Sequence, residues 1–408
     1  MNAGAKAYAA GFVASRLGLP EGWGQAELIP DGLAEELAFV LRGEEPRTTA
    51  EPYLEKEIQE LGKKFEKLAL EEHGFFVAKE TWPNGAPFAA CLTHDVDNIE
   101  RSASHLWARR ERFSKLDLMF ALLRLRSVYD NIAYVSRLER VRNLRSSFYF
   151  LTANYSLSKV APEIGELRRG GWDVGLHGDD GTHDSAEHLA ASVERFRQRL
   201  GFVPRGVREH YLRFDFAKTW EILERAGFDY DSTVGLRDRL GFRLGLAAPF
   251  HPPSPEWSPM SLLELPLVLM DTTLWGYLKN SEEAGIDAYR SLKEQVRRVK
   301  GLYTILWHQE AARMRGGRIY PRILDDLCSQ PGFIASGEEI SRWWRGREVP
   351  LVVEGNKVSI PESPPQGLVL RFVSQNERTL RVAGGAVERG SNGTLVRVES
   401  GGFKMEVD

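Results

Sequence analysis

The sequence predicts an α/β fold with a parallel sheet or barrel, preceded by a helical segment and followed by a small all-β module. From about residue 86 onward, short apolar runs alternate with helix-like stretches, which is typical of parallel strands joined by helices. Before that point the pattern is mostly helical. Beyond about residue 345 the chain consists of short alternating stretches separated by Gly and Asn turns, as in a small β domain.

The elements can be justified in chain order. Residues 51–72 predict a helix, because apolar side chains recur at helical spacing and Glu/Lys pairs occupy the other face. Buried strands are expected in the segments FAACLTHDVDN, SSFYFLTANYS, GWDVGLH, GVREHY, FDYDST, LLELPLVLMD and GLYTILWH, with helices between most of them. The C-terminal strands are expected in PLVVEGNKVSI, GLVLRFVS, TLRVAGGAVERG, GTLVRVES and FKMEVD.

Composition and charge narrow the classes of protein. The chain has 408 residues, 42% apolar and 27% charged, which suffices for a large core. The net charge of −3 gives no sign of nucleic-acid binding. The two cysteines, Cys91 and Cys328, form no CxxC pair, so neither a thiolate metal site nor a disulfide framework is expected. We find no transmembrane segment and a poor signal peptide, and therefore expect a cytoplasmic protein of undetermined oligomeric state.

Carboxylates, histidines and an arginine follow the predicted strands. In α/β folds, functional residues gather just past the C-terminal ends of strands. The residues at or shortly after these ends are Asp95, Asp97, His177, Asp179, Asp180, His183, Arg208, His210, Asp231, Asp271 and His308.

Asp95 and Asp97 raise a specific question, because residues two apart in a strand point to the same side and like charges repel. A metal ion, a shared proton or solvent could offset the repulsion. Carboxylate and imidazole ligands suit Zn²⁺ first, with nickel, cobalt, iron and manganese as alternatives. One aspartate would then bind metal, the other would take a proton from water, and a histidine would protonate a leaving amine. By the same alternation, His94 should face away from the carboxylates.

These segments resemble the polysaccharide deacetylase family, also called the NodB-homology or carbohydrate esterase family 4. The matching segments, in family order, are THDVD, GLHGDDGTH, GVREHYLRF, YDSTVG and ILWH, and SSFYF resembles the family's second strand. The resemblance implies a distorted (β/α)7-type barrel that hydrolyses the N-acetyl group of an amino sugar. The expected division is a mainly helical segment at 1–85, the barrel at 86–342, and a β-sandwich-like module at 346–408.

The resemblance also implies roles for individual residues. Asp95 would be the general base and His308 the general acid, while Arg208 would orient the base. Asp97 and His177 would bind the metal. Asp231, in the fourth motif, joins the catalytic set.

The chain departs from the family pattern twice. Val96 separates the two aspartates, so their roles as base and ligand can be exchanged. Gly181 stands where the second histidine of a His-x-x-x-His motif belongs. We expect His183 to be the third metal ligand, with His210 and Asp179 as alternatives.

The sequence leaves the exact substrate undetermined and is compatible with two other functions. The expected substrate is an acetylated amino sugar in a polysaccharide or glycan precursor, lipid- or nucleotide-linked. Residues 101–145 carry eleven basic and four acidic side chains, which suits an anionic substrate or membrane, although a solvated helix face explains them too. The alternatives are a metal-dependent hydrolase of another C–N bond and an inactive carbohydrate-binding protein.

Overall fold

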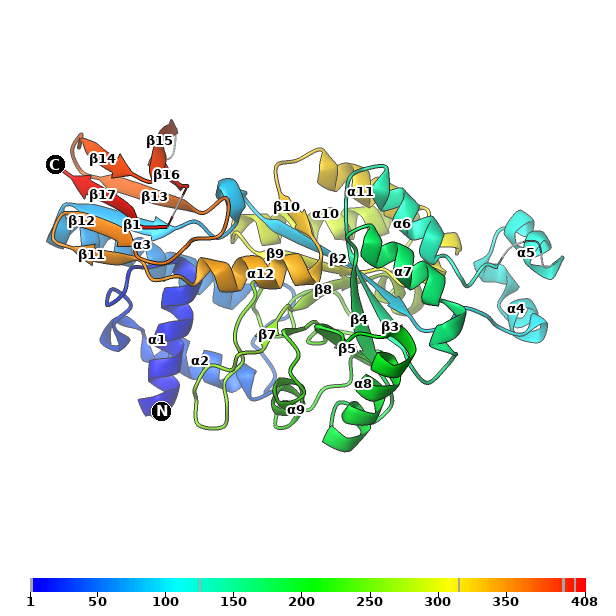
Figure 1. The fold of residues 1–408 in the computed structure, drawn as a ribbon. Helices are drawn as coiled ribbons and strands as arrows, with labels where there is room; N and C mark the ends of the chain where they lie inside the picture. Colours follow the sequence, from blue (N-terminus) through cyan, green and yellow to red (C-terminus); the bar gives the residue numbers. More distant parts are fainter. Residues whose placement is uncertain (1–2, 124, 126, 315, 391–392, 400) are drawn as a thin grey trace.

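A computed structural model describes residues 3–123, 125, 127–314, 316–390, 393–399 and 401–408. Its centre is a curled parallel sheet in the order β7-β6-β5-β4-β3-β2-β9-β8, with β10 added to the edge of β2 (Figure 1). The strands are β2 (Ala89–Val96), β3 (Ser147–Leu151), β4 (Asp173–Gly178), β5 (Gly206–Glu209), β6 (Tyr230–Asp231), β7 (Leu263–Glu264), β8 (Leu267–Met270), β9 (Leu302–Leu306) and β10 (Phe333–Ala335). The expected distorted α/β barrel is confirmed.

Both ends of this sheet come from one short stretch of chain. β7 and β8 close the two ends of the strand order, yet only Leu265 and Pro266 separate them in sequence. The sheet therefore curls back on itself, as in a barrel. The sheet has nine strands among the described residues, against the seven that the resemblance implies, and two of the nine, β6 and β7, are only two residues long.

Helices surround the sheet because each carries one apolar face. The helices are α6 (Ile132–Arg140), α7 (Ala161–Arg169), α8 (Ala186–Leu200), α9 (Thr219–Arg225), α10 (Glu282–Arg298), α11 (Ile319–Cys328) and α12 (Gly337–Arg347). Serine side chains cap the starts of α8, α10 and α12 by accepting a backbone N–H. No helix among the described residues has the length and apolar character needed to cross a bilayer.

The N-terminal helices pack against the barrel in one continuous apolar core. They are α1 (Ala3–Leu17), α2 (Asp31–Leu41) and α3 (Tyr53–His73). The buried guanidinium of Arg16 pairs with Glu55 at 2.7 Å and also donates to the carbonyl oxygen of Val299, beside the start of β9. These contacts hold α1 and α3 at the N-terminal ends of the parallel strands. The expected site lies at the opposite, C-terminal ends.

The C-terminal strands form two antiparallel sheets, β1-β13-β16-β15 and β11-β12-β17-β14, which share one apolar core. Their bounds are β11 (Val352–Glu354), β12 (Lys357–Ile360), β13 (Val369–Ser374), β14 (Leu380–Ala383), β15 (Gly385–Gly390), β16 (Gly393–Val398) and β17 (Phe403–Val407). The small all-β unit is confirmed. Its first strand, β1 (Phe75–Lys79), comes from the segment expected to be mainly helical, and it pairs with β13. The proposed three-part division stays a prediction.

Candidate metal centre and its surroundings

Asp95 and Asp97 lie at the C-terminal end of β2 and face the same histidine. His177 Nε2 is 3.6 Å from Asp95 Oδ2 and 3.2 Å from Asp97 Oδ1. His94, the residue before Asp95 in β2, points to the opposite side of the strand, into a buried network with Glu139 and Tyr320. The alternation expected for β2 therefore places both carboxylates on one side.

Asp97, His177 and His210 form the cluster that could hold a metal ion. One ligand atom from each lies within 4.8 Å of the other two, and this is the group of such residues found in the described part of the chain. Asp97 Oδ1 is buried and accepts no hydrogen bond from any described residue, although His177 Nε2 is close. A buried carboxylate oxygen without a donor, facing two imidazoles, fits a divalent cation.

The histidines are oriented by neighbours in a way that suits ligands. His177 Nδ1 lies 2.7 Å from the backbone oxygen of Arg208, so the ring donates there and leaves Nε2 facing Asp97. His210 begins the short helical turn η5 (His210–Leu212) directly after β5, and its ring crosses that of His177 at a centroid distance of 5.0 Å. Burial, with the nearby His177, lowers the pKa of His210 to about 4, so its ring is neutral at pH 7.

His183, the ligand expected from the sequence, stands apart from this cluster. Its backbone oxygen accepts from Thr219 Oγ1, and its Nε2 lies 3.8 Å from Asp184. The position four residues after His177 is Gly181, where φ is +87° and an added Cβ would come within 2.6 Å of His188. A side chain at this position is strained, which gives a physical reason for the missing second histidine.

Asp179, another alternative ligand, is engaged in the fold. Its carboxylate accepts from the backbone N–H groups of Thr152 and Ala153 and pairs with Arg195 at 2.6 Å. Ser192 also donates to it. These bonds tie the loop after β4 to the loop after β3 and to α8, so Asp179 organises the rim and does not face the metal cluster.

Arg208 is fully buried and joins three strands behind Asp95. Its guanidinium donates to Asp95 Oδ1 at 3.2 Å, to Thr93 Oγ1 at 2.7 Å, and to the backbone oxygen of Ser232 at 2.8 Å. It also lies over the ring of Tyr149. The rigid planar donor therefore holds one oxygen of Asp95 in place and leaves the other facing His177.

Asp231, expected among the catalytic residues, is fully buried in β6 and lies outside the metal cluster. It sits opposite Glu264 in the β6–β7 pairing and accepts from Thr233 Oγ1 at 2.5 Å. Burial raises the pKa of Asp231 to about 6, and burial together with the charge of Asp231 raises the pKa of Glu264 well above its usual value. Arg208 interacts electrostatically with Asp231 and donates a hydrogen bond to Asp95, so it connects the Asp231–Glu264 pair to Asp95.

His308 follows β9 and faces the cluster from the opposite side. Its Nε2 is 3.8 Å from Asp97 Oδ2, and its Nδ1 is 2.6 Å from Asp271 Oδ1. Asp271 also accepts the backbone N–H of His308, so it fixes both the ring and the turn. Burial would lower the pKa of His308, but Asp271 and the two strand-end aspartates raise it well above its usual value.

Two contributions were missed in the sequence. Asp271 is among the strand-end residues of the sequence but receives no role there, because its contact with His308 arises only when β8 and β9 pair. Glu310 comes two residues after His308, and one of its oxygens is buried without a hydrogen-bond donor among the described residues. Burial and the charge of Asp97 raise the pKa of Glu310 to about 7. Its position after a strand-end histidine was the only available signal.

Comparisons with known proteins place the fold. Neither a family model nor a curated protein sequence matches the chain. Among solved structures, a candidate polysaccharide deacetylase of Mycobacterium smegmatis is 18% identical, with 68% of this chain covering 97% of that one at a TM-score of 0.50. A counterpart from Pseudomonas aeruginosa PAO1 is 18% identical, covers 66% and 94% of the two chains, and has a TM-score of 0.48. An allantoinase is 17% identical, covers 65% and 93%, and has a TM-score of 0.47.

The M. smegmatis structure is matched over nearly its whole length. The resemblance expected from the five ordered segments is therefore confirmed at the level of the fold. The chain therefore shares its fold with the candidate polysaccharide deacetylase of M. smegmatis.

Proposed function

We propose that the protein is a metal-dependent hydrolase that removes the N-acetyl group from an amino sugar. The observation that carries the proposal is the geometry at the end of β2. One carboxylate, Asp97, lies with two imidazoles in a ligand cluster, while its neighbour Asp95 is held by Arg208 just outside that cluster. This separates a metal ligand from a base, which amide hydrolysis by a bound metal requires.

Asp97, His177 and His210 would hold the metal. Their mixed carboxylate and imidazole donors fit Zn²⁺, and nickel, cobalt, iron or manganese fit the same donors. When bound, such a cation polarises a carbonyl group and lowers the pKa of water. We assign the third position to His210 in place of the expected His183, because His210 is the histidine near both partners.

The remaining residues move protons. Water adds to the acetyl carbon, and Asp95, held by Arg208, accepts the proton that this water loses. His308, held by Asp271, donates a proton to the sugar nitrogen as the C–N bond breaks. The amide and water together give acetate and the protonated amine, and the proton taken up by Asp95 offsets the one that His308 gives, so atoms and charge balance. Asp231 contributes indirectly, because it forms with Glu264 the buried carboxyl pair beside Arg208, and Arg208 in turn holds Asp95.

An Asp95→Asn variant tests the assignment. The isosteric amide keeps the shape of the side chain but cannot accept the proton, so kcat for acetate release from chito-oligosaccharides should fall by about 10²- to 10⁴-fold. Metal content, measured by elemental analysis after loading with Zn²⁺, should stay the same as in the unmodified protein. Asp97→Asn is the matched control and should lose both activity and metal. An Asp95→Asn protein with full activity would contradict the proposal.

A further inference from the structure

The strongest surface feature outside the metal centre is a helical arm, residues 101–123. It contains α4 (Ala103–Ala108), the turn η3 (Arg110–Arg112) and α5 (Lys115–Leu122), and it stands away from the body of the barrel (Figure 1). The arm begins shortly after Asp97, which follows β2, and the chain then continues to α6. The arm carries several exposed large apolar side chains, namely Trp107, Leu116, Met119, Leu122 and Leu123.

Three of the exposed apolar side chains at α5 and its C-cap share one side of the helix, whereas Leu118, Ala121 and Leu122 lie on its other sides. Leu116, Met119 and Leu123 are spaced three and four residues apart, so they lie on the same side of the helix. Leu116 is 58% exposed and Leu123 is 60% exposed. A small core of Leu106 and Phe113 from the arm with Val128 and Tyr129 from the segment before α6 holds the arm in place, and the outward side chains do not join it. An outward apolar face of this kind is typical of a surface that contacts another phase or partner.

The charges of the arm favour one partner. Its basic residues are Arg101, Arg109, Arg110, Arg112 and Lys115, all exposed, against the acidic residues Glu111 and Asp117. The guanidinium of Arg110 lies over the ring of Trp107, which is itself 56% exposed. Tryptophan, leucine and arginine side chains together suit the boundary between anionic lipid headgroups and acyl chains, where apolar groups insert and cations remain at the surface.

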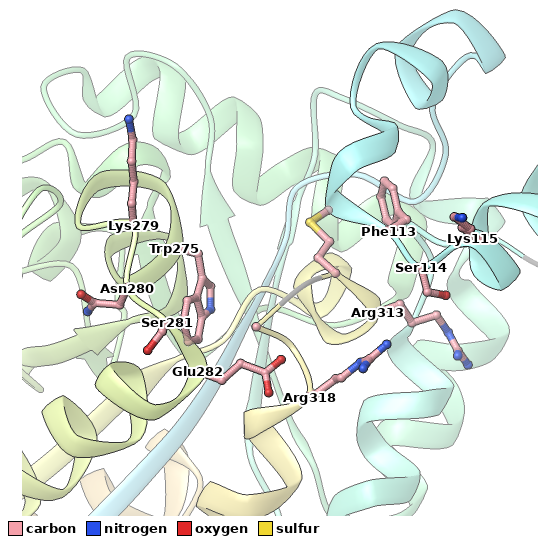
Figure 2. A pocket seen from close by; sticks show the side chains of 12 residues that line it. Phe113, Ser114, Lys115, Trp275, Lys279, Asn280, Ser281, Glu282, Arg313 and Arg318 are labelled. Carbon is pink, nitrogen blue, oxygen red and sulfur yellow. The ribbon is translucent and has the colours of Figure 1, made fainter.

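The arm lies beside the catalytic strand ends. Phe113 forms an antiparallel bridge with Met314, in the segment that follows His308. A cavity of about 620 Å³ opens at this junction, and Figure 2 shows its wall from the arm facing its wall around Trp275. Trp275 belongs to the short π-helix η6 (Thr273–Tyr277), which begins two residues after Asp271. The charged side chains that line the cavity are the basic Lys115, Lys279, Arg313 and Arg318 and one acidic residue, Glu282, so its lining is basic on balance.

We infer that the helical arm binds an anionic membrane surface and thereby holds the metal centre next to substrates carried on that membrane. The membrane contact rests on the arm alone. The substrate class that follows, an amino sugar linked to a membrane lipid through an anionic group, rests on the proposed function. The basic cavity between the arm and the segment after His308 suits such an anionic link.

Vesicle binding tests the membrane contact. The full chain is mixed with phosphatidylcholine vesicles, with and without phosphatidylglycerol, and the bound fraction is measured by co-sedimentation at low and high salt. We expect binding to the anionic vesicles that weakens at high salt. Leu116→Ser/Leu123→Ser should lower the affinity at least about tenfold, because the apolar face no longer inserts. Arg109→Gln/Arg112→Gln should lower it roughly thirtyfold.

Matched controls lie outside the arm. Val141→Ser/Val203→Ser changes two apolar side chains that are 72% and 50% exposed, and Arg169→Gln/Arg199→Gln changes two exposed arginines. Both should bind vesicles like the unmodified protein. Equal binding by arm and control variants would overturn the inference, and so would an absence of binding to anionic vesicles. A dimer that the arm variants dissociate, found without vesicle binding, would overturn it in favour of a second copy of the chain.

The test is independent of catalysis. The vesicles contain no acetylated sugar, so a protein that fails to bind them leaves the deacetylation proposal intact. A failed acetate-release assay likewise leaves the membrane contact standing.

Discussion

At the scale of single residues, two aspartates that are two positions apart have different partners. Asp95 accepts from the buried guanidinium of Arg208, whereas Asp97 faces His177 and His210 and has an oxygen without a hydrogen-bond donor among the described residues. Burial would raise the pKa of Asp97, but the surrounding histidines hold it below its usual value. The proposed division between base and ligand follows from this difference in partners, because the chemistry of the two side chains is the same.

The identity of the third ligand can be tested by metal content. His210→Ala should lose most bound Zn²⁺, because it removes one of three converging ligand atoms. His183→Ala should retain it, because His183 lies outside that cluster. Elemental analysis of both variants after dialysis measures the outcome. Retention in His210→Ala together with loss in His183→Ala would reverse the assignment.

Asp271 is expected to act by positioning His308. Asp271→Asn removes the carboxylate that holds His308 Nδ1 and should lower kcat by at least about tenfold, with KM and metal content little changed. A residue with a merely structural role would lower the thermal midpoint without this selective loss of kcat. Steady-state kinetics and a melting curve on the same preparation distinguish the two.

At the scale of elements, strands carry the site and helices hold the strands in register. A buried network shows this on the face of β2 away from the metal cluster. Glu139 of α6 lies 2.7 Å from His94 Nε2 on β2, accepts from Tyr320 of α11, and accepts from Trp172 Nε1 just before β4. Burial would raise the pKa of Glu139, but these donors, with His94 foremost, lower it.

The network predicts a pH-dependent contribution to stability. Glu139→Gln should lower the free energy of unfolding by about 3 kcal/mol near pH 7, because it removes the buried carboxylate on which His94, Tyr320 and Trp172 converge. A depressed carboxyl pKa stabilises the fold above its unfolded value near 4.5, and this stabilisation is lost as pH falls through the folded value. Urea unfolding at several pH values should therefore show the gap between the two proteins narrowing below about pH 4.5. A gap independent of pH would contradict this account.

At the scale of the whole molecule, segments distant in sequence complete one another. β1 pairs with β13, nearly three hundred residues later, and its side chains Phe75 and Val77 enter the core of the C-terminal sheets. The indole of Trp82 packs against Trp344 at the end of α12. The C-terminal strands are therefore bound to the N-terminal segment as well as to each other.

Removing residues 349–408 tests this dependence. The truncation leaves β1 without its partner strand and uncovers Phe75, Val77 and Trp82, so we expect an aggregated product. Soluble yield and size-exclusion chromatography of the truncated chain measure the result. A monodisperse truncated protein with an unchanged melting midpoint would show that the β unit is independent of the rest.

The sequence alone determined the features that depend on local periodicity. Alternation along β2 predicted that Asp95 and Asp97 share a side and that His94 faces away, and the alternation of strands and helices predicted the parallel sheet. Helical spacing predicted α3, which begins at Tyr53 and ends at His73. These features follow from neighbouring residues, whose geometry is set by the period of each element.

Tertiary structure decided the features that depend on distant pairing. The turn after β5 brings His210, rather than His183, beside Asp97, and the pairing of β8 with β9 brings Asp271 to His308. The pairing of β1 with β13 moved a strand out of a segment that reads as helical. Each of these contacts joins residues many positions apart, and which distant partners meet is set by the packing of the whole chain, on which local sequence spacing carries no information.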